Sequence, residues 1–201
     1  WCGATTTTTT APPVCAPTAQ RRRLTTLFVD IAGSTSLLAH HPPEAVLHAV
    51  QCFTALVSEA AVAHGGTVKD YEGDGALLCF ADTGAAVAAA LQIRRELAAG
   101  RCDVACDAGP GVRARMSLTV GDVVVGPIGS PARPGIALIG PSVNVGARLL
   151  KHVGEGGVIA SGEVVEALRL HDPALATRFT LRDTAYVVPG GDGLTVTTYE
   201  A

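Results

Sequence analysis

Three short segments of the chain carry side chains suited to chemistry on phosphates. Asp30 closes an apolar run and Asp74 lies between two glycines, so two carboxylates are available to bind a divalent metal ion. Asn144 and Arg148 are spaced to project together from one face of a helix. A guanidinium can stabilise the charge that develops when a phosphoryl group is transferred. Together these residue types indicate phosphoryl chemistry on a nucleotide.

Backbone groups directly after Asp30 could hold the phosphates themselves. Gly33 lets the backbone approach a ligand closely, and Ser34 or Thr35 is expected to cap a short helix. The N–H groups at the start of a helix can bind phosphate oxygens. We therefore expect Gly33, Ser34 and Thr35 to contact a triphosphate.

The helix that carries Asn144 and Arg148 is otherwise composed of small and apolar residues, so this face is expected to pack against the protein. A buried arginine needs an anionic partner. A ligand phosphate or a neighbouring carboxylate would satisfy it, and the sequence leaves both interpretations open.

Length and composition set the broad class of the chain. With 201 residues, one main domain with a substantial core is expected. No apolar run reaches the roughly 18 residues of a membrane-spanning helix. A net charge of -3 and an aromatic content of 4% argue against a nucleic-acid surface. We expect a cytoplasmic protein, or the cytoplasmic domain of a larger one, with no nucleic-acid partner.

The cysteines are scattered and form no C-x-x-C pair. They are Cys2, Cys15, Cys52, Cys79, Cys102 and Cys106. Cys102 and Cys106 are close in sequence, but no second pair and no histidine cluster follows them. This pattern favours reduced thiols of a cytosolic protein over a zinc site.

The chain divides into a tether and a folded domain. Residues 1–20 are rich in Thr and Pro, which is typical of a disordered segment, and residues 21–201 form the predicted domain. Arg21–Arg23 is expected to be a solvated domain edge rather than a lipid-headgroup contact. Because the chain starts at Trp1 instead of Met, we expect a fragment or a processed product.

Hydrophobic periodicity and turn residues predict the elements that position these groups. Strands are expected over residues 24–31, 67–71, 76–80, 113–125 (interrupted or bent at Gly121), 136–139, 158–160, 178–182 and 195–199, and helices over 44–64, 82–97, 140–149 and 162–170, with a loop over 100–111. The order is βαββαβ with additions, which predicts an α+β fold with a ferredoxin-like core and a mostly antiparallel sheet. Because that topology places the first strand beside the hairpin, Asp30 and Asp74 should lie close together, where a cation must offset their repulsion.

Four blocks of sequence resemble the catalytic domain of class III adenylate/guanylate cyclases, and the resemblance covers residues 22–201. They are LFVDIAGST (27–35), HGGTVKDYEGDGALLCF (64–80), VGDVVVG (120–126) and IGPSVNVGAR (139–148). The order and spacing of the blocks match the family, and together they are highly specific.

The resemblance implies a head-to-tail homodimer with active sites at the interface. Asp30 and Asp74 match the aspartates that bind two Mg²⁺ or Mn²⁺ ions per site, and the Ile31 carbonyl would touch one metal. Asn144 and Arg148 match the transition-state pair, which the opposite subunit supplies. The implied reaction is attack of the ribose 3′-oxygen of a nucleoside triphosphate on the α-phosphorus, with pyrophosphate leaving. Control by an upstream sensor or membrane segment is also expected.

The base-selecting positions depart from the family pattern. Adenylate cyclases resemble Lys-x-x-Gly-Asp at the hairpin, and guanylate cyclases carry Glu in place of the Lys. Here Asp70 occupies that position and Lys69 precedes it, with strand alternation expected to point them to opposite faces unless a bulge restores Lys69. The second reading position falls on Ala137, which offers no side-chain hydrogen bond. Asp70 could accept from guanine N1–H and N2–H or from the N6 amine of adenine.

The leading hypothesis is therefore an adenylate cyclase that makes cyclic AMP. The alternatives are a guanylate cyclase and a regulatory cyclase-homology module that dimerises and binds nucleotide without turnover. The lack of a Gly-Gly-(Asp/Glu)-Glu-Phe block argues against a diguanylate cyclase.

Overall fold

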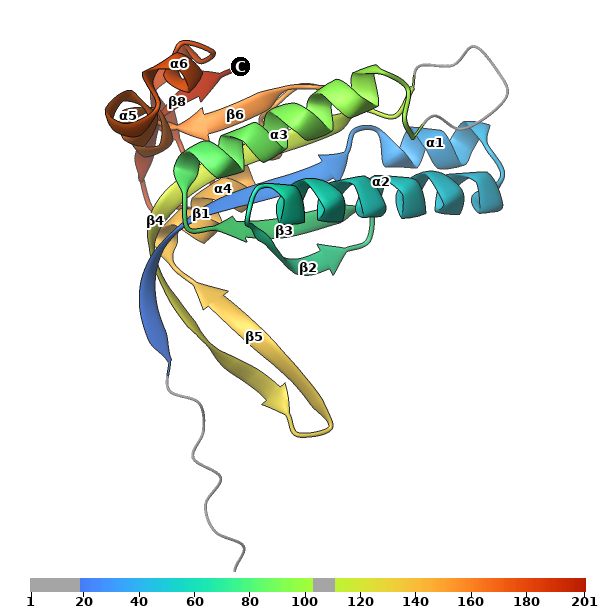
Figure 1. Cartoon of the computed structure of the whole chain (residues 1–201), viewed down its shortest axis with the longest axis horizontal. Helices are drawn as coiled ribbons and strands as arrows, with labels where there is room; N and C mark the ends of the chain where they lie inside the picture. The colour runs from blue at the N-terminus through green and yellow to red at the C-terminus, as the bar shows by residue number, and fades with distance from the viewer. Residues whose placement is uncertain (1–18, 103–110) are drawn as a thin grey trace, which may run out of the picture.

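An eight-stranded sheet runs through the computed structural model, which describes residues 19–102 and 111–201 (Figure 1). The strands are β1 (Gln20–Ile31), β2 (Thr67–Glu72), β3 (Gly75–Phe80), β4 (Ala114–Ser130), β5 (Arg133–Ile139), β6 (Val158–Ser161), β7 (Thr180–Val187) and β8 (Thr195–Glu200). The helices are α1 (Ser34–His40), α2 (Pro43–Ala63), α3 (Thr83–Ala98), α4 (Pro141–Leu149), α5 (Gly162–His171) and α6 (Pro173–Ala176).

The strand order is β2-β3-β1-β4-β6-β8-β7, with β5 paired to β4. The β2-β3-β1-β4 portion is antiparallel throughout, and only the β4–β6 pair among the described strands is parallel. This confirms the predicted α+β fold and its mostly antiparallel sheet. The strand β4 runs without interruption through Gly121, so the interruption that we considered there does not occur.

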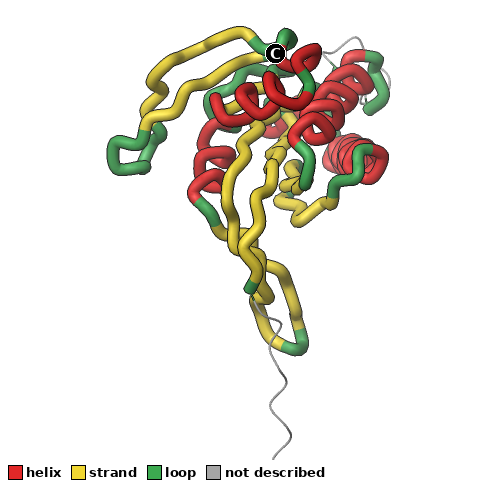
Figure 2. Tube along the Cα trace, turned by 60° about the vertical axis from the view of Figure 1, so that its left-hand side comes forward, coloured by secondary structure: helices red, strands yellow, loops and turns green. Residues whose placement is uncertain are grey.

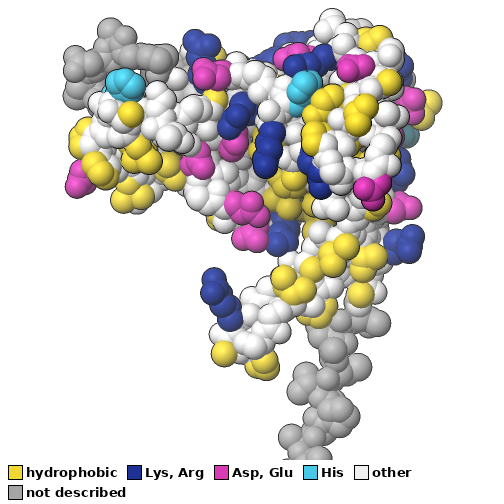
Figure 3. Space-filling view, turned by 180° about the vertical axis from the view of Figure 1, so that it is seen from behind, with side chains coloured by type: hydrophobic (Ala, Val, Ile, Leu, Met, Phe, Trp, Pro, Cys, Tyr) yellow, Lys and Arg dark blue, Asp and Glu magenta, His cyan; other side chains and the backbone are white. Residues whose placement is uncertain are grey.

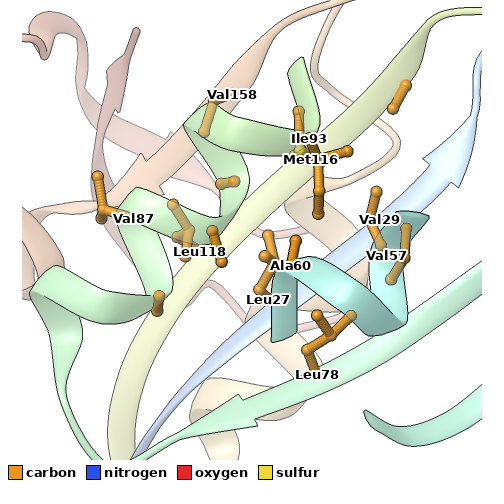
Figure 4. Close-up of a cluster of buried hydrophobic side chains, with 14 of the residues drawn as sticks. Leu27, Val29, Val57, Ala60, Leu78, Val87, Ile93, Met116, Leu118 and Val158 are labelled. Atoms are coloured by element: carbon orange, nitrogen blue, oxygen red, sulfur yellow. The ribbon is translucent and has the colours of Figure 1, made fainter. Parts of the chain in front are cut away.

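One face of the sheet is covered by α2 and α3, and the main core lies beneath them (Figure 4). Leu27, Val29 and Ile31 alternate along β1 toward these helices and are almost fully buried. By length and composition alone α2 could cross a membrane. Because its buried residues, including Phe53 and Val57, belong to this core, packing against the sheet accounts for that apolar composition.

The helix α4 packs on the opposite face of the sheet, against β1 and β4. Gly146 is needed for this close approach, since a Cβ there would lie 2.9 Å from the Phe28 ring. Ser117 Oγ donates to the Gly146 carbonyl at 2.7 Å, and Thr119 Oγ1 donates to the Ser142 carbonyl at 2.8 Å. These bonds fix α4 relative to the sheet.

A long arm formed by the ends of β4 and β5 projects from the body (Figures 1 and 2). Ile128, Ile136 and Ile139 on this arm are 53%, 59% and 67% exposed. The start of β1 pairs with the base of the arm, and Arg21–Arg23 lies exposed in this strand, as expected for a solvated edge of the domain. The predicted tether, residues 1–20, lies outside the described residues except for Ala19 and Gln20.

Gly140, the residue before α4, offers a test of how tightly this helix is held. A Cβ at position 140 would lie 2.7 Å from the Asp122 carbonyl oxygen, and this β4 backbone cannot move aside easily. We expect Gly140→Ala to lower the free energy of unfolding by about 1–3 kcal/mol, measured by urea denaturation. Gly154→Ala is the control, because a Cβ there meets nothing within 4 Å. Equal stability of the two variants would contradict this packing.

Candidate active site

The two predicted carboxylates lie at the same edge of the sheet. Asp30 at the end of β1 pairs with Gly75 of β3, and the Ile31 N–H donates to the Asp74 carbonyl at 3.3 Å. The tight β2–β3 turn uses Gly73 in the left-handed region, at φ 63°. The topology therefore brings Asp30 and Asp74 together, as the sequence predicted.

Asp30 also faces Arg115, which sequence reasoning missed. Arg115 lies opposite Asp30 on β4, and its Nε and Nη2 donate to the two carboxylate oxygens at 3.2 and 3.1 Å. Burial raises the pKa of Asp30, the Arg115 guanidinium lowers it, and the Asp74 charge raises it further. The only signal in the sequence was a charged residue in an apolar strand. Strand pairing was needed to identify its partner.

The donor atoms at this edge suit a hard divalent cation. Two carboxylates and the nearby main-chain carbonyl of Ile31 are oxygen ligands of the kind that Mg²⁺ and Mn²⁺ prefer. Within the described ranges no three His, Cys, Asp or Glu side chains form a cluster, so a bound metal would need further oxygens from a ligand. That requirement fits Mg²⁺, which usually combines one or two carboxylates with substrate phosphates.

The turn after Asp30 has the predicted glycine but a different cap. Gly33 adopts φ 69° and is itself the N-cap of α1, so the expectation that Ser34 or Thr35 caps this helix through its side chain was wrong. The Gly33 carbonyl accepts from the N–H groups of Ser36 and Leu37. In the described part of the chain, the N–H groups of Gly33, Ser34 and Thr35 have no acceptor, which leaves them available to a ligand.

Asn144 and Arg148 lie on α4, where Asn144 is exposed and Arg148 is half-buried. Across residues 19–102 and 111–201, no carboxylate lies within 4.0 Å of Arg148, so the neighbouring-carboxylate interpretation is not supported there. In the same ranges neither residue hydrogen-bonds to Asp30 or Asp74. Within the described residues, one chain therefore keeps the acidic group and the amide–guanidinium group apart.

A β-bulge places Lys69 and Asp70 differently from simple alternation. Val68 pairs with Leu78 and Asp70 pairs with Leu77, so Lys69 is an extra residue in β2. Its Nζ lies 3.0 Å from Asp70 Oδ2, and this contact lowers the pKa of Asp70. The bulge that the sequence analysis named as the alternative to simple alternation is therefore present, and the two side chains lie together.

Lys69 reaches toward the face of the sheet that carries α4. The Lys69 charge acts on the Cys79 thiol and lowers its pKa, so the two side chains are near each other. Cys79 is paired with Thr26 of β1, and the Thr26 hydroxyl hydrogen-bonds to Thr119 on the face that carries α4. Burial raises the pKa of Cys79 to about 11, so this thiol stays protonated. The Lys69 side chain is only 20% exposed, against 54% for Asp70. The lysine side chain is therefore packed more closely against the protein, and the carboxylate of Asp70 is more open to solvent.

The last predicted positions are the base-selecting Ala137 and the cysteine pair Cys102 and Cys106. Ala137 lies on β5 opposite Gly126, in the arm that extends below the β2–β3 hairpin in the view of Figure 1. The Cys102–Cys106 zinc interpretation falls partly outside the described residues, since Cys106 is not among them. Cys102 Sγ instead lies 2.7 Å from Cys52 Sγ.

On the α4 side, basic and acidic side chains lie side by side on the body and hydrophobic ones follow the arm (Figure 3).

Comparisons with known proteins identify the family of this chain. The family model for the adenylate and guanylate cyclase catalytic domain matches residues 17–200. Adenylate cyclase 1 of Rhizobium meliloti is 32% identical over 151 residues, which cover 71% of this chain and 23% of that protein. An uncharacterised protein of Mycobacterium tuberculosis is 32% identical over 148 residues, covering 72% of this chain and 27% of that protein. The chain thus spans about a quarter of these relatives.

Solved structures share the fold. The adenylyl cyclase CyaB from P. aeruginosa superposes with a TM-score of 0.79 at 24% identity, over 92% of this chain and 95% of that chain. The guanylate cyclase domain of RhGC from Catenaria anguillulae, in complex with GTP, gives 0.73 at 19% identity, over 90% and 97%. At these identities the likeness establishes the fold and no more.

The Asp30 carboxylate provides a test through stability alone. Because the folded-state pKa of Asp30 is raised, ionising this carboxylate destabilises the folded protein. This destabilisation is absent below the ordinary pKa of 3.8, grows as the pH rises from there to the folded-state pKa, and is constant above it. We expect Asp30→Asn to stabilise the metal-free protein at about pH 7 by less than about 1 kcal/mol and to have no effect at about pH 3. Denaturant titrations with a chelator measure this.

Asp122→Asn serves as the control for this comparison, because Asp122 is an exposed carboxylate on β4. It should leave stability unchanged at both pH values. A loss of stability in Asp30→Asn at neutral pH would show that the Arg115 pair outweighs burial.

Proposed function

The chain belongs to the adenylate and guanylate cyclase catalytic domain family, and we propose that it converts ATP to 3′,5′-cyclic AMP and pyrophosphate at the interface of a head-to-tail homodimer. The observation that carries this proposal is the separation of two complementary half-sites in one chain. Asp30, Asp74 and Arg115 meet at one sheet edge, while Asn144 and Arg148 lie on α4 without contacting them in the described residues. A second copy placed head to tail would combine them.

Each residue has a role that its chemistry supports. Asp30, Asp74 and the Ile31 carbonyl would hold two Mg²⁺ or Mn²⁺ ions, which when bound would lower the pKa of the ribose 3′-hydroxyl and offset the triphosphate charge. The N–H groups of Gly33, Ser34 and Thr35 would donate to phosphate oxygens. Arg115, already next to Asp30, adds a guanidinium to this phosphate region.

The reaction is an in-line displacement within one nucleotide. The ribose 3′-hydroxyl gives up its proton to solvent, and its oxygen forms a bond to the α-phosphorus. The bond from that phosphorus to the bridging oxygen breaks, and pyrophosphate leaves. Asn144 of the opposite subunit would orient the ribose, and Arg148 would donate to the α-phosphate oxygens as charge accumulates there. The amide and the guanidinium therefore act on the transition state more than on substrate binding.

The bulge at Lys69 supports ATP as the substrate. An ammonium group donates hydrogen bonds and accepts none, so Lys69 suits the N1 acceptor of adenine better than the N1–H of guanine. Pairing with Lys69 also occupies part of the Asp70 carboxylate. Because Ala137 contributes no polar contact, we expect modest selectivity between the purines, with ATP preferred.

Guanylate cyclase activity is the second candidate, and the exposure of Asp70 favours it. Its carboxylate is 54% exposed and could accept from guanine N1–H and N2–H. Incubating the purified chain with Mg²⁺ or Mn²⁺ and either ATP or GTP, and identifying the product by mass, decides between the two. Nucleotide binding without any cyclic product would support the regulatory cyclase-homology module instead.

The greater length of the relatives supports a proposal about regulation. Because this chain matches only about a quarter of each of them, we propose that the domain works in the cytoplasm under the control of an upstream sensor or membrane segment.

The shared site can be tested by complementation. Asp74→Ala and Arg148→Ala should each reduce cyclase activity at least about 100-fold, because each removes one half of both sites. Mixing them at equal amounts should restore about a quarter of wild-type activity, since half of the random dimers contain one intact site. Asp122→Ala, which touches neither half-site, is the matched control. Heterodimers that form but stay inactive would rule out sites shared between subunits.

The base preference can be tested at the bulge. Lys69→Ala should reduce kcat/KM for ATP at least about tenfold while changing that for GTP less, because it removes the donor proposed to read adenine. Asp70→Lys with Ala137→Asp should sharpen the preference for ATP. A wild-type selectivity beyond roughly 1,000-fold for either nucleotide would mean that other residues read the purine.

A further inference from the structure

The turn between β7 and β8, residues Val188–Leu194, packs directly onto α4. Val188 is 2% exposed and shares a small hydrophobic cluster with Val145 and Leu149 of that helix. The Val188 N–H donates to the Leu194 carbonyl at 2.8 Å, and the Leu194 N–H donates to the Gly191 carbonyl at 2.9 Å. The turn, at the far end of the β7–β8 hairpin (Figure 2), is therefore closed by its own backbone and anchored to the helix that carries Arg148.

Within this turn, Gly190 lies against the Arg148 guanidinium. Gly190 adopts φ 65°, and a Cβ built on it would lie 2.6 Å from Arg148 Nη1, 3.4 Å from Nη2 and 3.5 Å from Cζ. All three distances involve the guanidinium group itself. The space that a side chain at 190 would fill is the space that this guanidinium occupies.

The contact constrains a side chain that would otherwise be free to turn. An arginine has several rotatable bonds and is usually held by a bidentate carboxylate. No carboxylate in the described ranges lies within 4.0 Å of the half-buried Arg148, and its guanidinium lies beside Gly190. A carboxylate would neutralise the cation, whereas a glycine backbone leaves its positive charge available for a phosphate.

We propose that the Val188–Leu194 turn is a seat that orients the Arg148 guanidinium, with Gly190 as a positioning residue for the cyclase reaction. The inference rests on the proposed function, in which Arg148 acts on the α-phosphate at the partner's metal site. A cation held in place before the reaction stabilises the transition state without reorganisation, so the seat contributes to kcat rather than to nucleotide affinity.

Gly193 provides a matched control in the same turn. It also has a positive φ, 82°, but a Cβ there meets nothing within 4 Å. Gly193→Ala therefore imposes the same kind of backbone strain as Gly190→Ala without touching Arg148. We expect Gly190→Ala to reduce kcat by about 10–100-fold with KM within about twofold, and Gly193→Ala to keep kcat within about twofold of wild type.

Two further variants separate positioning from folding. Gly190→Asn brings the same Cβ against Arg148 in a residue that tolerates positive φ, so it should reproduce the kcat loss with less loss of stability. In an Arg148→Ala background, Gly190→Ala should cause no additional loss, because the group that it displaces is already gone.

The outcomes distinguish this inference from the proposed function. If Arg148→Ala lowers activity but Gly190→Ala and Gly190→Asn do not, the seat is wrong and the site assignment stands. Equal losses in Gly190→Ala and Gly193→Ala, or a full additional loss in the Arg148→Ala background, would show a structural role only. A wild-type chain that makes no cyclic nucleotide, or an Arg148→Ala variant with normal turnover, would overturn both.

Discussion

The close approach of Asp30 and Asp74 is the constraint on which the rest of the site depends. Because β1 lies between β3 and β4, the hairpin turn carries Asp74 to one side of Asp30 and the facing strand brings Arg115 to the other. Two carboxylates this near each other require positive charge, and Arg115 supplies part of it within the chain. The proposed metal ions and triphosphate would join a charge balance that the strand order has already set.

Arg148 differs from Arg115 in having no carboxylate partner among the described residues. Arg115 is neutralised by a carboxylate, whereas Arg148 has none within 4.0 Å in the described residues and rests on the backbone of Gly190. α4 is held by hydrogen bonds from Ser117 and Thr119, which leave Asn144 exposed. A helix fixed so firmly, with an exposed amide and an uncompensated cation, is suited to act on an anion that lies outside its own chain. This is why we favour a shared site in a dimer.

A single extra residue in β2 changes which side chain is available at the proposed base-selecting position. Without the bulge, Lys69 and Asp70 would point to opposite faces of the strand. With it, their side chains form an ion pair, and the lysine extends over the face that carries α4. The local insertion thus combines a donor and an acceptor where the family pattern has one residue, which bears on the proposed preference for ATP.

The sequence by itself determined most of the elements, the βαββαβ order and the family, because hydrophobic periodicity and motif spacing are local properties of the chain. The proximity of Asp30 to Asp74 followed from the topology that this order predicts. The sequence offered the bulge at Lys69 only as an alternative, and it could not reveal that Arg115 pairs with Asp30 or that Gly190 contacts Arg148. Each of these depends on register between strands or on packing between segments far apart in sequence. Residues 115 and 30 meet only because β1 and β4 pair in one register of several, and a shift of one position would turn these side chains to the other face. Such pairings are decided by the packing of the whole sheet, so only the tertiary structure could show them.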